Sequence, residues 1–181
     1  MLDTSVMVGA VPVRHPEAVV TEALDGYFAM ARGTQDVAPL EMTKWFDTNY
    51  HYPVPELGPD TVFAADSTKR VQEFGEALAL GHDARPVLVG PVTYLLPAKP
   101  APGVAANFEP LTLLDRLLPV YAEVLADLRA AGAQWVQLDE PALVAGPLPR
   151  GAERRRARLP RSGCAHRPAA ASGRLVLRPA R

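Results

Sequence analysis

The sequence is short of the residues that several classes of protein require. Its 181 residues include one cysteine, Cys164, which excludes an internal disulfide framework and suits a reducing compartment. No apolar run approaches the roughly 18 residues that a membrane-spanning helix needs. The opening residues Met-Leu-Asp-Thr-Ser lack the basic start and apolar stretch of a signal peptide. These absences predict a cytoplasmic protein with no membrane partner.

Acidic residues and lysine are scarce in the last part of the chain. Residues 1–149 hold 9 basic and 19 acidic side chains, whereas residues 150–181 hold 10 arginines, no lysine and one acid, Glu153. The net charge of -1 conceals this asymmetry. A split of this kind can indicate a basic arm that binds nucleic acid, attached to an acidic domain.

Residues 147–181 also lack the apolar periodicity of the preceding chain. They are rich in Arg, Pro and Ala, which predicts a disordered tail after a patterned domain of residues 1–146. Two origins remain open: translation of GC-rich DNA in a shifted reading frame, which we favour, or a genuine basic tail. Cys164 and His166 lie in this tail without the further ligands that zinc requires, so we predict no metal site.

Helical and extended patterns alternate through residues 1–146. Apolar residues at helical spacing predict helices that end near Gly33, Gly81 and Gly132. Short apolar runs at 86–89 and 135–138 predict buried strands, while residues 5–8 fit either a strand or the end of a helix. This order predicts βαβ units, and therefore an α/β fold in which parallel strands alternate with helices.

Polar residues follow the predicted strands at positions where parallel α/β folds gather functional groups. These positions are Lys44 with the loop after it, residues 90–93, and the pair Asp139 and Glu140. The two adjacent carboxylates resemble a general acid/base pair. A carboxylate at a strand end is as easily a cap for the next helix, so both interpretations stay open.

The run Glu41–Tyr52 concentrates aromatic and polar side chains without helical or strand alternation, which indicates a binding surface. Its aromatic residues could stack on a pterin or pack at a domain interface, and we favour the interface; they are Trp45, Phe46, Tyr50 and Tyr52. Lys44 could be a ligand contact or an ordinary surface lysine. His51 could brace the loop or act in acid–base chemistry, and we favour the brace.

Several separated motifs are similar to those of one enzyme family. They are Val8-Gly-Ala-Val-Pro-Val-Arg-His15, the run 41–56, Glu76-Ala-Leu-Ala-Leu-Gly-His82, Pro86-Val-Leu-Val-Gly-Pro-Val-Thr93, Leu118-Pro-Val-Tyr121 and Trp135-Val-Gln-Leu-Asp-Glu-Pro-Ala-Leu-Val144. Their order and spacing over residues 1–145 resemble the N-terminal half of the cobalamin-independent methionine synthases. The resemblance implies a methyltransferase that moves a methyl group from a 5-methyltetrahydrofolate polyglutamate to homocysteine.

The resemblance also implies where the chemistry lies. The family is built from two (β/α)8 barrels, and its C-terminal barrel holds zinc through His, Cys and Glu side chains to activate the homocysteine sulfur. A complete barrel needs at least about 200 residues, so residues 1–146 are expected to form an incomplete TIM-like barrel. We therefore expect no catalytic residue and no metal ligand in this chain.

One site residue is carried over from the resemblance. The polyglutamate tail of the folate is a string of carboxylates, which requires cationic side chains, and Lys44 matches the family lysine assigned to that contact. We predict a fragment of the enzyme that retains part of the folate-binding half and is inactive alone; whether a separately encoded chain supplies the remaining half stays open. The alternative is a standalone module whose arginine-rich tail binds nucleic acid or another polyanion.

Overall fold

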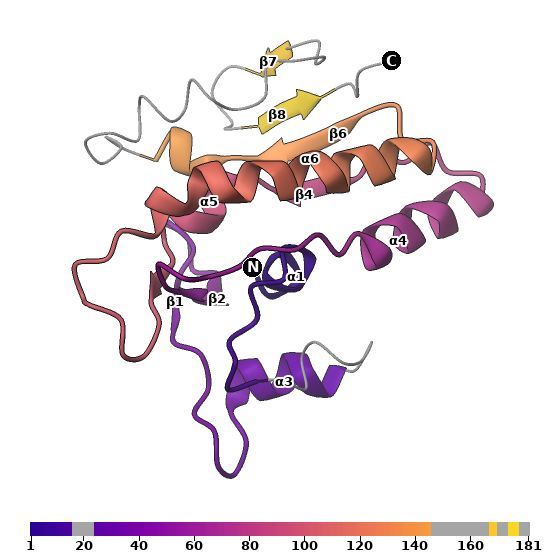
Figure 1. Cartoon of the computed structure of the whole chain (residues 1–181). Helices are drawn as coiled ribbons and strands as arrows, with labels where there is room; N and C mark the ends of the chain where they lie inside the picture. Colours follow the sequence, from indigo (N-terminus) through magenta and orange to yellow (C-terminus); the bar gives the residue numbers. More distant parts are fainter. Residues whose placement is uncertain (16–23, 146–166, 170–173, 178–181) are drawn as a thin grey trace.

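The computed structural model describes residues 1–15, 24–145, 167–169 and 174–177 (Figure 1). The helices are α1 (Leu2–Met7), α3 (Leu24–Arg32), α4 (Thr68–Ala79), α5 (Pro91–Leu95) and α6 (Leu114–Ala130), with 3-10 turns η1 (Pro110–Leu113) and η2 (Pro141–Leu143). The strands are β1 (Met42–Lys44), β2 (His51–Pro53), β3 (Glu56–Leu57), β4 (Val87–Val89), β5 (Lys99–Pro100), β6 (Val136–Asp139), β7 (Arg167–Ala169) and β8 (Arg174–Leu177). Within these ranges, no helix has both the length and the apolar character that crossing a membrane demands.

The described strands form three sheets. β1 and β2 pair antiparallel, β3 and β5 pair parallel, and the third sheet has the order β4-β6-β8-β7. The parallel pairing of β4 with β6, across a connection that contains α5 and α6, is the predicted βαβ unit. The α/β prediction is therefore confirmed. No barrel closes among the described strands, so the finer prediction of an incomplete TIM-like barrel stays a prediction.

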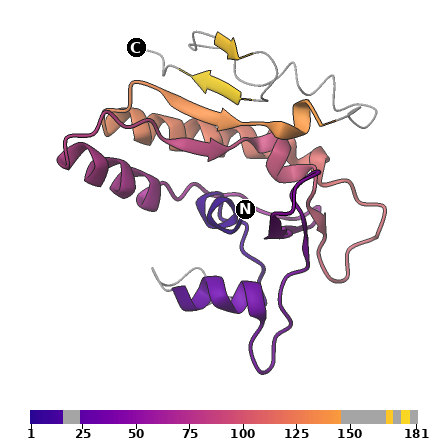
Figure 2. The same ribbon diagram turned by 180° about the vertical axis from the view of Figure 1, so that it is seen from behind.

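Helix α6 covers one face of the β4–β6 pair, in front of it in Figure 1 and behind it in Figure 2. Leu88 and Leu138 pair in register and are both buried. Leu117 and Leu128 of α6 are fully buried in the same core cluster. The hydroxyl of Tyr121, also in α6, donates a hydrogen bond of 2.7 Å to the carbonyl oxygen of Val89. Apolar burial and this polar contact together hold helix to sheet.

Two short segments of the expected disordered tail are strands. β8 pairs antiparallel with β6, and β7 pairs antiparallel with β8. The sequence Arg-Leu-Val-Leu is rich in residues that favour strands. The edge of β6 has backbone N–H and C=O groups available, and pairing with β8 gives them hydrogen-bond partners. The expectation of disorder is therefore wrong for residues 167–169 and 174–177. The rest of the tail, with Cys164 and His166, lies outside the described residues.

Helix α1 settles the ambiguity at residues 5–8 in favour of a helix end. The hydroxyls of Ser5 and Tyr94 lie 3.1 Å apart in the core, which ties α1 to α5. The carbonyl oxygen of Val8 accepts a hydrogen bond of 3.0 Å from the backbone N–H of Ala64. Gly9 follows with φ +67°, and a Cβ there would stand 3.0 Å from the Ala64 carbonyl oxygen. A glycine is required by both the dihedral angle and the close approach.

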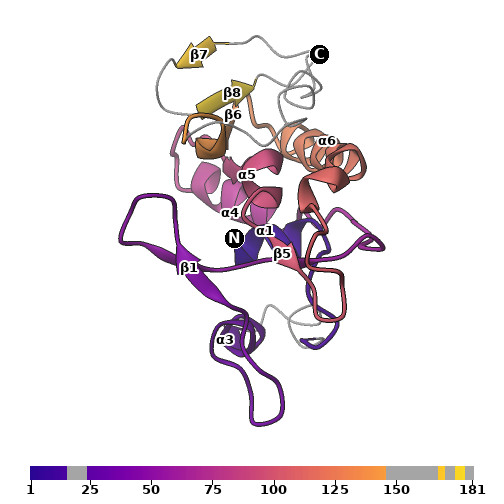
Figure 3. The ribbon, with the colours of Figure 1, turned by 90° about the vertical axis from the view of Figure 1, so that its left-hand side faces the viewer.

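Helix α3 lies on the far side of α1 from α6 (Figure 3). It ends before Gly33, as predicted, where φ is +78° and a Cβ would meet the Val37 carbonyl oxygen at 2.7 Å. The pattern of this helix at the sequence level opens at Pro16, where the missing N–H is harmless, and that start lies outside the described residues. The other two predicted helices correspond to α4 and α6, and glycines with positive φ follow both.

Asp3 joins α1 to α3 and α4 through its carboxylate. It accepts hydrogen bonds from the Tyr27 hydroxyl at 2.6 Å and from Lys69 Nζ at 2.7 Å, and Arg70 lies 3.5 Å away. Burial alone raises the pKa of Asp3. The hydrogen bonds from Lys69 and Tyr27 and the charge of Arg70 outweigh that effect, and they lower the pKa from 3.8 to about 2.

This lowered pKa predicts a loss of stability in acid. The carboxylate contributes its full stabilisation above pH 3.8, and the contribution disappears as the pH falls through about 2. Asp3→Asn removes the charge, so it should lower the unfolding free energy at neutral pH by about 1 kcal/mol after allowance for solvent screening. Urea titrations of both proteins between pH 2 and pH 7 measure this. Equal pH slopes for the wild type and the variant would contradict it.

Candidate functional site

The β1–β2 hairpin holds Lys44, the residue predicted to contact ligand. The register pairs Met42 with Pro53, Thr43 with Tyr52, and Lys44 with His51. The backbone N–H of Trp45 donates to the Tyr50 carbonyl oxygen at 2.7 Å and closes the hairpin beyond Lys44. Figure 3 shows β1 and the adjoining turn projecting from the layers that contain α4 and α6.

The two faces of the hairpin differ in exposure. Directly opposite residues share a face, so Lys44 and His51 lie on one face and Thr43 and Tyr52 lie on the other. Lys44 and His51 are exposed, whereas Tyr52 is only 3% exposed. One face therefore anchors the hairpin and the other presents two nitrogen-bearing side chains to solvent.

Aromatic packing holds the anchored face. The ring of Trp45 meets the rings of Phe46 and Tyr52 edge to face, at centroid distances of 5.1 and 5.2 Å. Phe46 has φ +49°, a left-handed conformation that costs a side-chain-bearing residue about 1–2 kcal/mol. Its packing against the main core offsets that strain. Tyr50 does not share this burial and is 65% exposed.

Lys44 differs from the other two lysines of the chain. Lys69 forms an ion pair with Asp3, and Lys99 forms a short ion pair with Glu41. In the part of the chain that the structure describes, no carboxylate forms an ion pair with Lys44. An exposed cation without an internal counter-ion is suited to an anionic ligand.

The Glu140 side chain links the end of β6 to the start of α5 by hydrogen bonds. Its side chain is 1% exposed, and its two carboxylate oxygens accept the backbone N–H groups of Val92 at 3.0 Å and Thr93 at 2.7 Å. Burial raises the pKa of Glu140, and the hydrogen bonds from Thr93 and Val92 oppose that rise. Glu140 thus caps the helix that precedes it in the chain, not the next one.

The predicted strand-end positions come together only in part. Residues 90–93 and Glu140 meet through the cap just described. The Asp139 carboxylate accepts a hydrogen bond of 2.7 Å from the side chain of Gln137. No hydrogen bond or ion pair among the described residues joins Lys44 to this group. No local sequence pattern predicted the Glu41–Lys99 ion pair, which links the base of the hairpin to β5.

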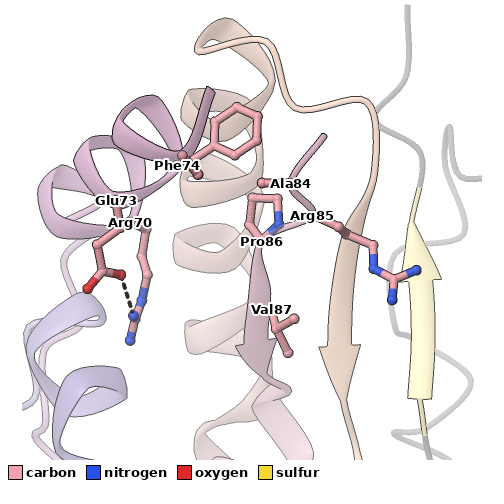
Figure 4. A pocket seen from close by; sticks show the side chains of 8 residues that line it. Arg70, Glu73, Phe74, Ala84, Arg85, Pro86 and Val87 are labelled. Atoms are coloured by element: carbon pink, nitrogen blue, oxygen red, sulfur yellow. Dashed lines mark hydrogen bonds and ion pairs between the residues drawn. The ribbon is translucent and has the colours of Figure 1, made fainter. Parts of the chain in front are cut away.

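A cavity of about 170 Å³ lies between α4 and β4 (Figure 4). Its apolar wall includes Phe74, Pro86 and Val87. Arg70 at its rim is paired with Glu73 at 3.2 Å, and Arg85 points away from α4 toward β6. Arg70 is engaged by Glu73 and Asp3, so we assign this cavity no ligand.

The described residues do not fit a zinc ion. In residues 1–15, 24–145 and the two tail strands, no three His, Cys, Asp or Glu side chains come close enough to ligate a metal. A zinc site needs three or four such ligands. We therefore derive no chemical step through zinc from these side chains.

Taken together, the fold and the hairpin define an α/β domain with an exposed lysine on an anchored hairpin and a buried, structural carboxylate. Residues 1–156 match the family model described as the N-terminal domain of cobalamin-independent synthase. The chain belongs to this family.

The relatives with curated names are much longer. A 5-methyltetrahydropteroyltriglutamate–homocysteine methyltransferase of Streptomyces avermitilis is 83% identical over 149 residues, which cover 82% of this chain and 19% of the relative. A protein of the same name from Streptomyces griseus is 82% identical over 149 residues, with the same shares. A chloroplastic form from Arabidopsis thaliana is 60% identical over 144 residues, covering 80% of this chain and 18% of the relative. The chain spans about a fifth of the length of these relatives.

The tie between Glu140 and α5 makes Gly90 sensitive to substitution. A Cβ at Gly90 would stand 2.2 Å from the Glu140 Cδ, whereas a Cβ at Gly75, exposed in α4, would have nothing within 4 Å. We expect Gly90→Ala to lower the unfolding free energy by about 1–3 kcal/mol. Gly75→Ala should raise it by up to about 1 kcal/mol, because alanine favours a helix. Urea unfolding curves measure both, and an unchanged midpoint for Gly90→Ala would contradict the tie.

Proposed function

We propose that this chain forms part of the folate-binding half of a cobalamin-independent methionine synthase. In this proposal the ligand is the polyglutamate tail of 5-methyltetrahydrofolate, and Lys44 contacts one of its carboxylates. The observation that carries it is the exposed position of Lys44 on an anchored hairpin, without an ion pair among the described residues. The names of the relatives, which specify a triglutamate folate and homocysteine, support the substrate class.

The physical role of Lys44 is electrostatic. The aromatic contacts of Trp45 fix the hairpin, so the position of the lysine is determined before ligand arrives. An ammonium group binds a carboxylate through charge-assisted hydrogen bonds, which are stronger than those between neutral groups. Such a contact selects for charge on the tail and leaves the methyl group of the folate untouched.

The methyl transfer itself is assigned to residues outside those described. We propose that zinc and homocysteine are bound elsewhere, by a C-terminal part of the enzyme or by a separately encoded chain, and that this chain alone is inactive. The βαβ unit of β4, α5, α6 and β6 is consistent with part of a TIM-like barrel, and the proposed enzyme is cytoplasmic.

The alternative of a polyanion-binding module depends on the arginines of residues 150–161. These lie outside the described residues, and no contact among the described residues favours that function. It stays a hypothesis.

The proposal predicts that Lys44 distinguishes folates by the length of their tail. The full 181-residue chain should bind 5-methyltetrahydrofolate triglutamate more tightly than the monoglutamate. Lys44→Met should weaken binding of the triglutamate about fivefold, because one exposed ion pair is worth up to about 1 kcal/mol. It should leave the monoglutamate affinity unchanged. Isothermal titration calorimetry at low ionic strength measures all four combinations.

Lys69→Met is the matched control for this test. It removes the same charge from α4, where Lys69 pairs with Asp3, and it should not change the preference for the triglutamate. A Lys44→Met protein that keeps the full preference would disprove the assignment of Lys44. A wild-type chain that shows no preference for the triglutamate over the monoglutamate would disprove the proposed function.

A further inference from the structure

We propose that His51 is a second contact for the same carboxylate tail and that it binds in its protonated form, so that ligand binding takes up a proton. This inference rests on the proposed function of Lys44. It assigns a role to a side chain on the exposed face of the hairpin, where the earlier interpretation was a loop brace.

The hydrogen bonds of the hairpin place Lys44 and His51 at a closely spaced pair of the ladder. The backbone N–H of Trp45 donates to the Tyr50 carbonyl oxygen, and the N–H of Val54 donates to the Glu41 carbonyl oxygen. In an antiparallel ladder, hydrogen-bonded pairs alternate with non-hydrogen-bonded ones. Lys44 and His51 lie next to the first of these bonds, so they form a non-hydrogen-bonded pair. Cα atoms in such pairs are about 4.5 Å apart and side chains are at their closest.

The contact of His51 with the loop determines which protons the ring carries. Its Nδ1 lies 3.0 Å from the carbonyl oxygen of Asn49, an acceptor, so Nδ1 must hold a proton to make this hydrogen bond. In a neutral ring Nε2 is then an acceptor and repels a carboxylate. Only the imidazolium has N–H groups at both nitrogens. A carboxylate that reaches Nε2 therefore requires one additional proton.

The neighbouring charge makes this protonation depend on ligand. Two cations directly opposite each other on adjacent strands repel. A carboxylate between them replaces that repulsion with two attractions. The other charged groups on the hairpin and at its base are Asp47 in the turn and the Glu41–Lys99 pair, which is internally neutral. The proton is thus coupled to the anion through Lys44 and His51.

The test measures the affinity for 5-methyltetrahydrofolate triglutamate at pH 6 and pH 8 with the full chain. We expect about threefold tighter binding at pH 6, with proton uptake visible as a dependence of the calorimetric enthalpy on the buffer. His51→Gln keeps a polar side chain of similar reach without the charge. It should abolish both the pH effect and the proton uptake, while at pH 8 it binds like the wild type.

His82→Gln is the matched control, because His82 is exposed beyond the end of α4 and lies on no part of the hairpin. It should keep the full pH effect. A wild-type affinity that is equal at both pH values, or an unchanged pH effect in His51→Gln, would overturn the inference. If Lys44→Met still removes the triglutamate preference in that case, the proposed function stands and only the role of His51 fails. Thermal unfolding of each variant confirms that it is folded.

Discussion

The carboxylate of Glu140 is the interaction on which the described domain depends. It extends from the end of β6 to the first backbone N–H groups of α5, the helix that follows the neighbouring strand β4. A buried carboxylate is costly unless its oxygens are paired, and these two N–H donors supply the pairing. Gly90 makes the approach possible by having no side chain. The Glu140 side chain therefore links the end of β6 to the start of α5, in addition to the backbone pairing of β4 with β6.

The hairpin of the candidate site is held in place by different contacts, because little of it packs against the core. Its stability comes from the edge-to-face contacts of Trp45, from the burial of Tyr52 and from the ion pair at its base. These contacts use one face only. The opposite face is then free to concentrate positive charge without disturbing the fold. This division explains why a run of aromatic and polar residues has no simple period: one face of the hairpin is buried and the other is exposed.

The sequence predicted the features that local rules determine. Apolar spacing and terminal glycines identified α4 and α6, and the short β-branched runs identified β4 and β6. Long-range partners were beyond such rules. Glu140 was correctly suspected of capping a helix, but its partner is a preceding helix, 47 and 48 residues away in the chain. The sequence did not predict the tail strands. β8 pairs with the open edge of β6, and the composition around β8 does not reveal that long-range partner. Lys44 was named from the resemblance, and its ligand contact stays a prediction.

The small free energy of exposed ion pairs limits what this hairpin can contribute to binding by an enzyme. An exposed ion pair contributes up to about 1 kcal/mol, and micromolar affinity requires about 8 kcal/mol. Two cations on one face therefore cannot by themselves retain a folate. In the proposed function they discriminate, because each additional carboxylate on the tail would meet a charge that a shorter tail never reaches. A surface of this kind is most useful when the pterin is bound by other parts of a longer protein, and the chain spans only about a fifth of its relatives. Under the proposed function, the hairpin contributes selectivity for tail length, while most of the binding energy comes from contacts elsewhere.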